Sequence, residues 1–301
     1  MANENSLLDL EKIETQIIKT TFSDCFEIIP GDLTSEFSRN AESSAEFETY
    51  KAIFKTVQPE VCLDIGTNIG TNALFFAGHC RHVYAFEPNP YIYPVLQRNI
   101  ERNNANISAF PYGLSDAAAE LNLHIELNWN TGHSSFVSEN ASKNSQLVST
   151  RVEVGDEVLV KEHIGPVDFI KIDTEGYETN VLLGLRQCIL QHKPVIALEW
   201  NTDSTRRGFR EHNLLVSLFP DYLCFGLGAP WRKSLYPTIG SKIARGIAKN
   251  FLKVRRPLSL QKFVFDLDYE LIFLIPERFS RIVHELTFWP KGYCPSVGEF
   301  T

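Results

Sequence analysis

Short apolar runs alternate along this chain with longer segments in which apolar residues recur every three or four positions. The apolar runs lie at residues 61–65, 83–87, 107–112, 167–173 and 195–201. Helical spacing follows at about 70–79, 92–103 and 174–191. Strands that are apolar throughout and separated by helices are typical of a parallel sheet with both faces covered. The sequence therefore predicts an α/β fold with a Rossmann-like, mostly parallel sheet.

The remaining segments are predicted to add a cap and a closing pair of strands. Residues 7–20 and 45–57 carry apolar faces at helical spacing, and residues 24–32 suggest a short strand and turn. We expect this cap to cover the sheet edge, with a lid over the ligand as the alternative. The other predictions are a turn at 113–116, strands at 121–127 and 148–154, and a helix at 203–219. Residues 222–227 and 269–275 are predicted to form an antiparallel pair that closes the sheet.

Two acids and two glycines stand at the ends of the first two strands. Asp64, Gly66 and Gly70 form the pattern Asp-x-Gly-x-x-x-Gly, and glycine at such a turn lets the backbone approach a ligand closely. A carboxylate here repels the pyrophosphate of a dinucleotide and suits a cationic ligand, such as a sulfonium. Glu87 can accept hydrogen bonds from both hydroxyls of a ribose. Together these residues favour S-adenosylmethionine over a nicotinamide cofactor.

The composition is that of an ordinary soluble globular protein. The 301 residues are 44% hydrophobic and 22% charged, and no apolar run approaches the length of a membrane span. The amino terminus is polar and acidic, so we expect no secretory signal. The six cysteines show no C-x-x-C pair, and we expect reduced thiols. These features predict a cytoplasmic protein.

The net charge of −8 is unevenly distributed. Residues 231–262 contain nine Lys or Arg and no Asp or Glu, while the acidic remainder argues against nucleic-acid binding. Residues 239–256 predict a basic amphipathic helix, because apolar side chains recur there every four positions. Three interpretations remain: a solvated face, peripheral contact with an anionic membrane, or a site for an anionic acceptor. The predicted divisions are a cap (1–57), a core (58–228), a basic insertion (229–265) and a closing strand with tail (266–301).

Four blocks of the sequence resemble the FkbM-type methyltransferases. They lie at residues 63–70, 84–89, 170–178 and 195–199, with weaker support from 268–276. The likeness covers roughly residues 48–201, and the four blocks in this order are far more specific than any one alone. The resemblance implies a class I methyltransferase fold and an S-adenosylmethionine-dependent enzyme. Members of this family are mostly O-methyltransferases that act on hydroxyls of sugars and other natural products.

The resemblance also implies roles for individual residues. Asp64, Gly66 and Gly70 match the turn at the methionine end of the cofactor, and Glu87 matches the acid that binds the ribose. The expected cofactor-binding residues are Asp64, Gly66, Thr67, Asn68, Gly70, Glu87, Pro88, Ser115, Asp116 and Asp173. Thr67 departs from the family pattern, in which a smaller alanine is usual. Asp173, Glu175 and Gly176 match the Lys-Ile-Asp-x-Glu-Gly block beside the site of methyl transfer.

A hydroxyl is a poor nucleophile, so a base must help to remove its proton. The candidates are Asp173, Glu175, His133 and Glu199. These acids also have plainer interpretations. Asp173 could be a helix N-cap, Glu175 could stabilise the first turn of the helix through its dipole, and Glu199 could be an ion-pair partner. His133 lies in a polar loop, where a histidine is more often simply exposed. We expect Asp173 and Glu199 to face one cleft, because they end adjacent strands.

Three further hypotheses stay open. Asp173, Glu199 and Asn201 offer hard oxygen ligands that suit a divalent metal, which we hold as the minority mechanism. A nicotinamide-dependent oxidoreductase would share the sheet and the ribose acid, and a non-catalytic glycan or lipid adaptor would share the scaffold. The preferred prediction is an O-methyltransferase that acts on a hydroxyl of a sugar, glycoconjugate or related natural product.

Overall fold

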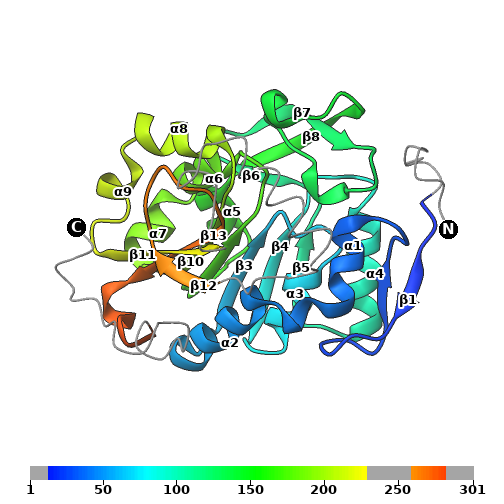
Figure 1. Ribbon diagram of the computed structural model, residues 1–301, viewed down its shortest axis with the longest axis horizontal. Helices are drawn as coiled ribbons and strands as arrows, with labels where there is room; N and C mark the ends of the chain where they lie inside the picture. Colours follow the sequence, from blue (N-terminus) through cyan, green and yellow to red (C-terminus); the bar gives the residue numbers. More distant parts are fainter. Residues whose placement is uncertain (1–12, 229–258, 283–301) are drawn as a thin grey trace, which may run out of the picture.

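A mostly parallel sheet runs through the centre of the protein (Figure 1). The computed structural model describes residues 13–228 and 259–282, and within them this sheet has eight strands. Their order is β12 (Ser259–Lys262), β11 (Tyr222–Gly228), β13 (Tyr269–Pro276), β10 (Val195–Trp200), β9 (Phe169–Ile172), β3 (Val61–Ile65), β4 (His82–Phe86) and β5 (Ile107–Phe110). Strands β10, β9, β3, β4 and β5 are parallel to one another. Strand β13 is antiparallel to both of its neighbours, β10 and β11. The predicted parallel sheet and its antiparallel closing pair are confirmed.

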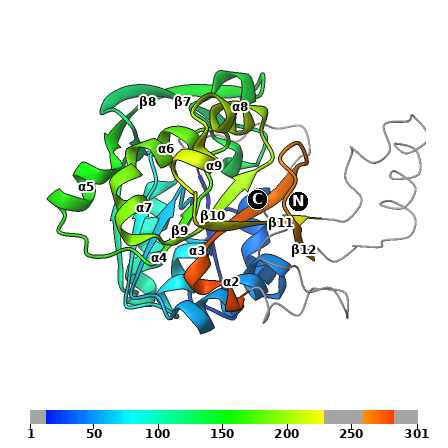
Figure 2. The same ribbon diagram turned by 90° about the vertical axis from the view of Figure 1, so that its left-hand side faces the viewer.

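Helices cover both faces of this sheet. One apolar cluster joins it to α2 (Ala45–Val57), α3 (Thr71–Ala77) and α4 (Tyr93–Asn103). The other joins it to α5 (Gly155–Lys161), α6 (Glu178–Gly184), α7 (Arg186–His192), α8 (Asp203–Glu211) and α9 (Leu214–Ser217). Figure 2 shows α2 and the group of α6, α8 and α9 on opposite sides of the sheet. Because both faces are buried, the strands require the continuous apolar runs seen in the sequence.

Helix α2 has the bounds that the sequence predicts. The Ser44 hydroxyl accepts a backbone N–H of its first turn at 3.3 Å, and Gln58, with φ of 50°, ends it in the left-handed conformation. The ring of Tyr50 packs edge-on against Phe76 and Phe169, at centroid distances of 5.2 and 5.7 Å. Each ring buried in this way contributes about 1.5–3 kcal/mol, so α2 is anchored in the core.

A second sheet lies over the carboxyl end of the parallel strands. Its order is β6 (Gly113–Ser115), β8 (Ser145–Val154) and β7 (Ala119–Glu126), followed along the chain from β7 by the short helices η3 (Thr131–His133) and η4 (Ser138–Asn140). The strands predicted at 121–127 and 148–154 are confirmed. The prediction of a turn at 113–116 is wrong over residues 113–115, because these pair in parallel with β8. Each of these residues pairs with one that is 39 positions away, so local composition does not reveal the strand.

Two predicted helices and the start of the cap differ from the structure. Residues 16–18 form β1 (Gln16–Ile18), which pairs with β2 (Phe26–Ile28), so the helix predicted at 7–20 is wrong over its described part. The helix predicted to reach residue 191 is divided at Leu185, and the one at 203–219 is divided at Asn213, whose φ is 48°. The other described elements are α1 (Leu33–Phe37), η2 (Ser38–Ser43) and η5 (Glu277–Phe279).

Several sequence predictions concern segments outside the described residues. The basic amphipathic helix at 239–256 lies there, and the domain divisions remain predictions. In the described part of the chain, no helix is both long and apolar enough to cross a bilayer. The cysteines of that part, Cys25, Cys62, Cys80, Cys188 and Cys224, are free thiols, as expected.

Candidate active site

The carboxyl ends of the central strands open into one cavity of about 360 Å³. Its wall includes Glu46, Gly66, Asn68, Asn72, Glu87, Pro88, Gly113, Leu114, His133, Asp173, Glu175, Tyr177, Glu199 and Glu270. Ligands of open α/β sheets bind at this edge, where the turns after the strands converge. The strands therefore gather most of the predicted site residues in one place.

The glycine turn after β3 fastens three strands together. Gly66 has φ of +81°, and a Cβ built on it would lie 1.9 Å from the carbonyl oxygen of Asp173. Its N–H donates to the Phe86 carbonyl at 3.0 Å, and the Asp173 N–H donates to the Ile65 carbonyl at 2.9 Å. Thr67 fits the turn because its hydroxyl donates to the Asp64 carbonyl at 2.7 Å. Only glycine suits position 66, since it has no Cβ.

Glu87 lines the same cavity, directly after β4. Its two carboxylate oxygens accept the backbone N–H groups of Asn68 and Asn89, at 2.7 and 2.8 Å. Burial raises the pKa of Glu87 to about 7, although both hydrogen bonds favour the charged form. Each oxygen keeps a further lone pair, so the carboxylate can also accept from two neighbouring hydroxyls.

Asp64 lies behind the cavity wall. The residue is only 1% exposed, it is absent from the lining, and its Oδ2 has no hydrogen-bond partner within the described chain. Burial raises the pKa of Asp64 to about 7; the Lys171 ammonium opposes this rise, and the charges of Asp173 and Glu87 add to it. The Asp64 carboxylate therefore acts on the cavity electrostatically, without direct contact, and it also interacts electrostatically with Glu87.

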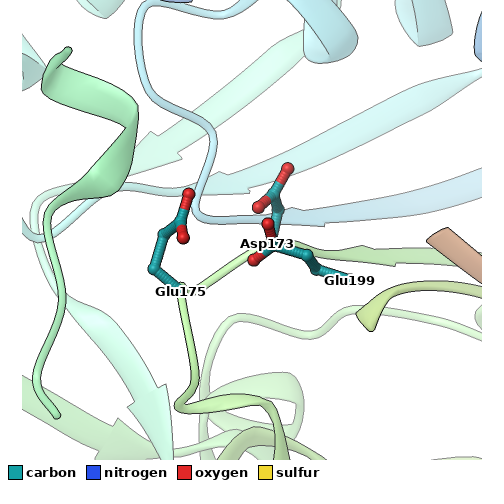
Figure 3. A group of neighbouring side chains, drawn as sticks. All are labelled: Asp173, Glu175 and Glu199. Atoms are coloured by element: carbon teal, nitrogen blue, oxygen red, sulfur yellow. The ribbon is translucent and has the colours of Figure 1, made fainter. Parts of the chain in front are cut away.

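Three acids converge beside the glycine turn (Figure 3). Asp173 follows β9, Glu175 follows two residues later, and Glu199 lies in the adjacent strand β10. Ligand oxygens of all three lie within 4.8 Å of one another. The expectation that Asp173 and Glu199 face one cleft is confirmed.

The acids of this cluster differ in their proton affinity. Burial raises the pKa of Glu175 to about 9, and the charges of Asp173 and Glu178 add to the rise. Burial and the Asp173 charge hold the pKa of Glu199 well above its usual range. Burial would also raise the pKa of Asp173, but the Lys171 ammonium outweighs it and lowers this pKa. Asp173 is thus the acid of the cluster that stays ionised at neutral pH.

Lys171 is a site residue to which the sequence interpretation gave no role. It is fully buried in β9, and its Nζ donates to Asp173 Oδ2 at 2.7 Å. The charges of Asp173, Glu46 and Asp64 raise its pKa, although burial opposes them. The sequence could have indicated this role, because Lys171 stands inside an otherwise apolar strand and a lysine is almost never fully buried unless it is paired.

Glu46 also lines the cavity and was missed, because it belongs to α2, outside the motifs. The Tyr50 hydroxyl donates to its Oε1 at 2.8 Å, and burial raises the pKa of Glu46. Helix α2 thereby brings a further acid to the cavity from the predicted cap.

The turn that carries Glu175 is fixed from both sides. Glu175 has φ of 53°, an uncommon conformation that needs external support. Its carbonyl accepts hydrogen bonds from the Ser135 hydroxyl and the Asn140 amide, each at 2.7 Å. From below, the buried Glu178 carboxylate accepts the N–H groups of Thr174 and Gly176, at 3.0 and 3.1 Å. The loop 128–144 and α6 together position the acid.

The remaining candidates lie at the edge of the site. His133 is 62% exposed in η3, and its Nε2 is 3.8 Å from Glu175 Oε1. Asn201 donates its amide N–H to Glu199, so it orients this acid. Ser115 and Asp116 bond to Tyr177 and Asn180, and neither lines the cavity, although Gly113 and Leu114 of the same segment do.

The described fold and site define a Rossmann-like methyltransferase: a mostly parallel sheet with antiparallel closing strands, a glycine turn after β3 and acids at neighbouring strand ends. The family model described as the methyltransferase FkbM domain matches residues 64–223, more than half of the chain. The protein therefore belongs to the FkbM methyltransferase family, as its sequence motifs imply.

Individual relatives are more distant. The hexuronic acid methyltransferase AglP of Haloferax volcanii is 29% identical over 133 residues, which cover 44% of this chain and 52% of the relative. The solved structure of the methyltransferase FkbM of Methylobacillus flagellatus is 19% identical with a TM-score of 0.44, over 72% of this chain and 44% of that chain. The O-methyltransferase of Bacillus cereus, solved in complex with SAH, is 15% identical with a TM-score of 0.41, over 82% and 92%. The chain spans about half the length of the curated relative.

Proposed function

We propose that this protein is an S-adenosylmethionine-dependent O-methyltransferase that acts on a hydroxyl of a sugar or glycoconjugate. The observation that carries the proposal is one cavity lined both by the Glu87 carboxylate and by the cluster of Asp173, Glu175 and Glu199. Membership of the FkbM methyltransferase family supports the reaction. The likeness to a hexuronic acid methyltransferase supports a sugar acceptor.

The cavity suits the methyl donor on three counts. Glu87 has free lone pairs for the ribose hydroxyls, and Gly66, Thr67 and Asn68 of the glycine turn line the cavity. Asn72 Oδ1 is buried at the wall with no partner in the described residues, and this unpaired acceptor matches an ammonium donor. When bound, S-adenosylmethionine supplies an electrophilic methyl group.

The acid cluster provides the proton acceptor for the hydroxyl. Asp173 takes this role, because its ion pair with Lys171 keeps a carboxylate at the cavity wall. Glu175 and Glu199 position the acceptor by hydrogen bonds, and His133 at the rim can pass the proton to solvent. Alignment of the hydroxyl with the methyl group contributes most, since a well-oriented pair can save about 7–11 kcal/mol.

Two measurements test this proposal. Isothermal titration with S-adenosylhomocysteine should show saturable binding to the wild-type protein, and its absence would reject the donor. Transfer of a radiolabelled methyl group should then be screened against neutral sugars, uronic acids and lipid-linked glycans. We expect Asp173→Asn to abolish transfer while S-adenosylhomocysteine still binds. Full activity of this variant would exclude Asp173 as the base.

A further inference from the structure

We propose that Asp173, Glu175 and Glu199 form a binding site for one divalent cation of the Mg²⁺, Mn²⁺ or Ca²⁺ class. The three residues come from two adjacent strand ends and the turn between β9 and α6, so the fold itself brings them together. Figure 3 shows their carboxylates close to one another. All three line the cavity, so a bound ion would be accessible from it.

The spacing of the carboxylates fits an ion. Each offers an oxygen within 4.8 Å of the other two. Ca²⁺ binds oxygen at about 2.3–2.6 Å, so two ligands on opposite sides of the ion are about 4.6–5.2 Å apart. Mn²⁺ and Mg²⁺ require shorter distances, which a small rotation of the partly buried Asp173 and Glu175 side chains would supply. Hard carboxylate oxygens suit this class of ion over softer metals.

An unpaired oxygen of Glu199 is a second, independent reason to expect a cation at this site. The residue is 8% exposed, and its Oε2 has no hydrogen-bond partner in the described part of the chain, while Oε1 is held by Asn201. A buried carboxylate oxygen without a donor costs about 1–3 kcal/mol or more. An ion beside Asp173 and Glu175 would satisfy this oxygen.

The cavity wall is also rich in acids, which favours a cation as the ligand. Lys171 is the ammonium paired with the cluster, and it engages only Oδ2 of Asp173. None of the described residues in the cavity wall is Lys or Arg, and the wall adds Glu46, Glu87 and Glu270. An ion held by three protein ligands keeps coordination positions for substrate oxygens. If the proposed function holds, the ion would bind the acceptor hydroxyl in place of direct hydrogen bonds from Glu175 and Glu199, and it would lower the pKa of this hydroxyl.

Direct binding of Mn²⁺ tests the site without methyl donor or acceptor. Chelator-treated wild-type protein should bind one Mn²⁺ in isothermal titration, with the bound ion also seen by electron paramagnetic resonance. Glu199→Gln keeps the shape of the side chain and removes its charge, and we expect the affinity to fall about tenfold or more. The matched control is Glu157→Gln, an exposed acid of α5, which should bind like wild type.

Thermal unfolding separates binding from misfolding. Mn²⁺ should raise the Tm of wild type and Glu157→Gln but leave that of Glu199→Gln unchanged. If Glu199→Gln does not fold, Glu175→Gln takes its place in both experiments. A wild-type protein without saturable Mn²⁺ binding, or a cluster variant that binds like wild type, would overturn the proposal. Either result leaves methyl transfer to be judged by its own assay.

Discussion

Replacement of Gly66 by alanine probes the turn on which the site depends. The new Cβ would lie 1.9 Å from the Asp173 carbonyl oxygen, whereas real Cβ contacts are essentially never shorter than 3.0 Å. The carbonyl must therefore retreat by about 1 Å, and a close-packed interior resists such a shift. This movement would pull apart the turns that follow β3 and β9.

The cost of this substitution follows from the contacts of the turn. A left-handed φ costs a residue with a Cβ about 1–2 kcal/mol. The retreat also breaks the bonds from Gly66 N–H to Phe86 and from Asp173 N–H to Ile65, worth about 1 kcal/mol each. The sum is about 3–4 kcal/mol of unfolding free energy. At about 2–4 °C per kcal/mol, the Tm should fall by about 6–16 °C.

The assay is thermal and urea unfolding followed by circular dichroism, with Gly165→Ala as the matched control. A Cβ at Gly165 meets nothing within 4 Å, and its φ is not left-handed, so this variant should unfold like wild type. Gly66→Ala should also weaken S-adenosylhomocysteine binding. Equal Tm values for the two variants would refute the close approach of the turn to Asp173.

Three further predictions concern the charged groups. Lys171→Met should lower the unfolding free energy by about 3 kcal/mol in urea titrations, which is the low end for a broken buried ion pair because the Asp173 side chain is 37% exposed. The exposed control Lys161→Met should have little effect, and similar values for the two variants would contradict a buried ion pair. Glu87→Gln should weaken S-adenosylhomocysteine about 10–100-fold by calorimetry, because an amide would face a backbone N–H; unchanged affinity would exclude the ribose role. Asp64 is buried, and burial raises its pKa to about 7. The folded state therefore binds more protons than the unfolded state between about pH 4 and 7. The unfolding free energy should fall as the pH rises through this window. Urea titrations at pH 5 and 7.5 should show a smaller fall for Asp64→Asn than for wild type, and equal falls would contradict the raised pKa.

The sequence predicts the central sheet well because burial dictates its composition. A strand covered on both faces, such as β10, is apolar over most of its length, and its first polar side chain, Glu199, then marks the end where ligands bind. This is why Asp64, Glu87 and Asp173 could be placed at one edge from their positions alone. The helix α2 was predictable for a related reason, since its apolar stripe, its serine cap and the proline after it agree.

The differences arise where distant partners decide the structure. Residues 16–18 are compatible with a helix face, but pairing with β2 makes them a strand. Residues 113–115 resemble a turn until β8 supplies their hydrogen bonds. Glu46 illustrates the same limit in the site, because nothing in α2 itself shows that its first turn points at a cavity. Lys171 could have been recognised, since only a paired ammonium persists in a buried strand.

The hydrogen bonds from loop 128–144 to the Glu175 carbonyl have a consequence for engineering this loop. Ser135 and Asn140 hold the backbone of the turn, not its acidic side chain, so both contacts are independent of which acceptor is bound. A chimera that exchanges this loop for that of a relative should therefore retain a donor at each of these two positions. The intervening residues could then vary without disturbing the turn that carries Glu175.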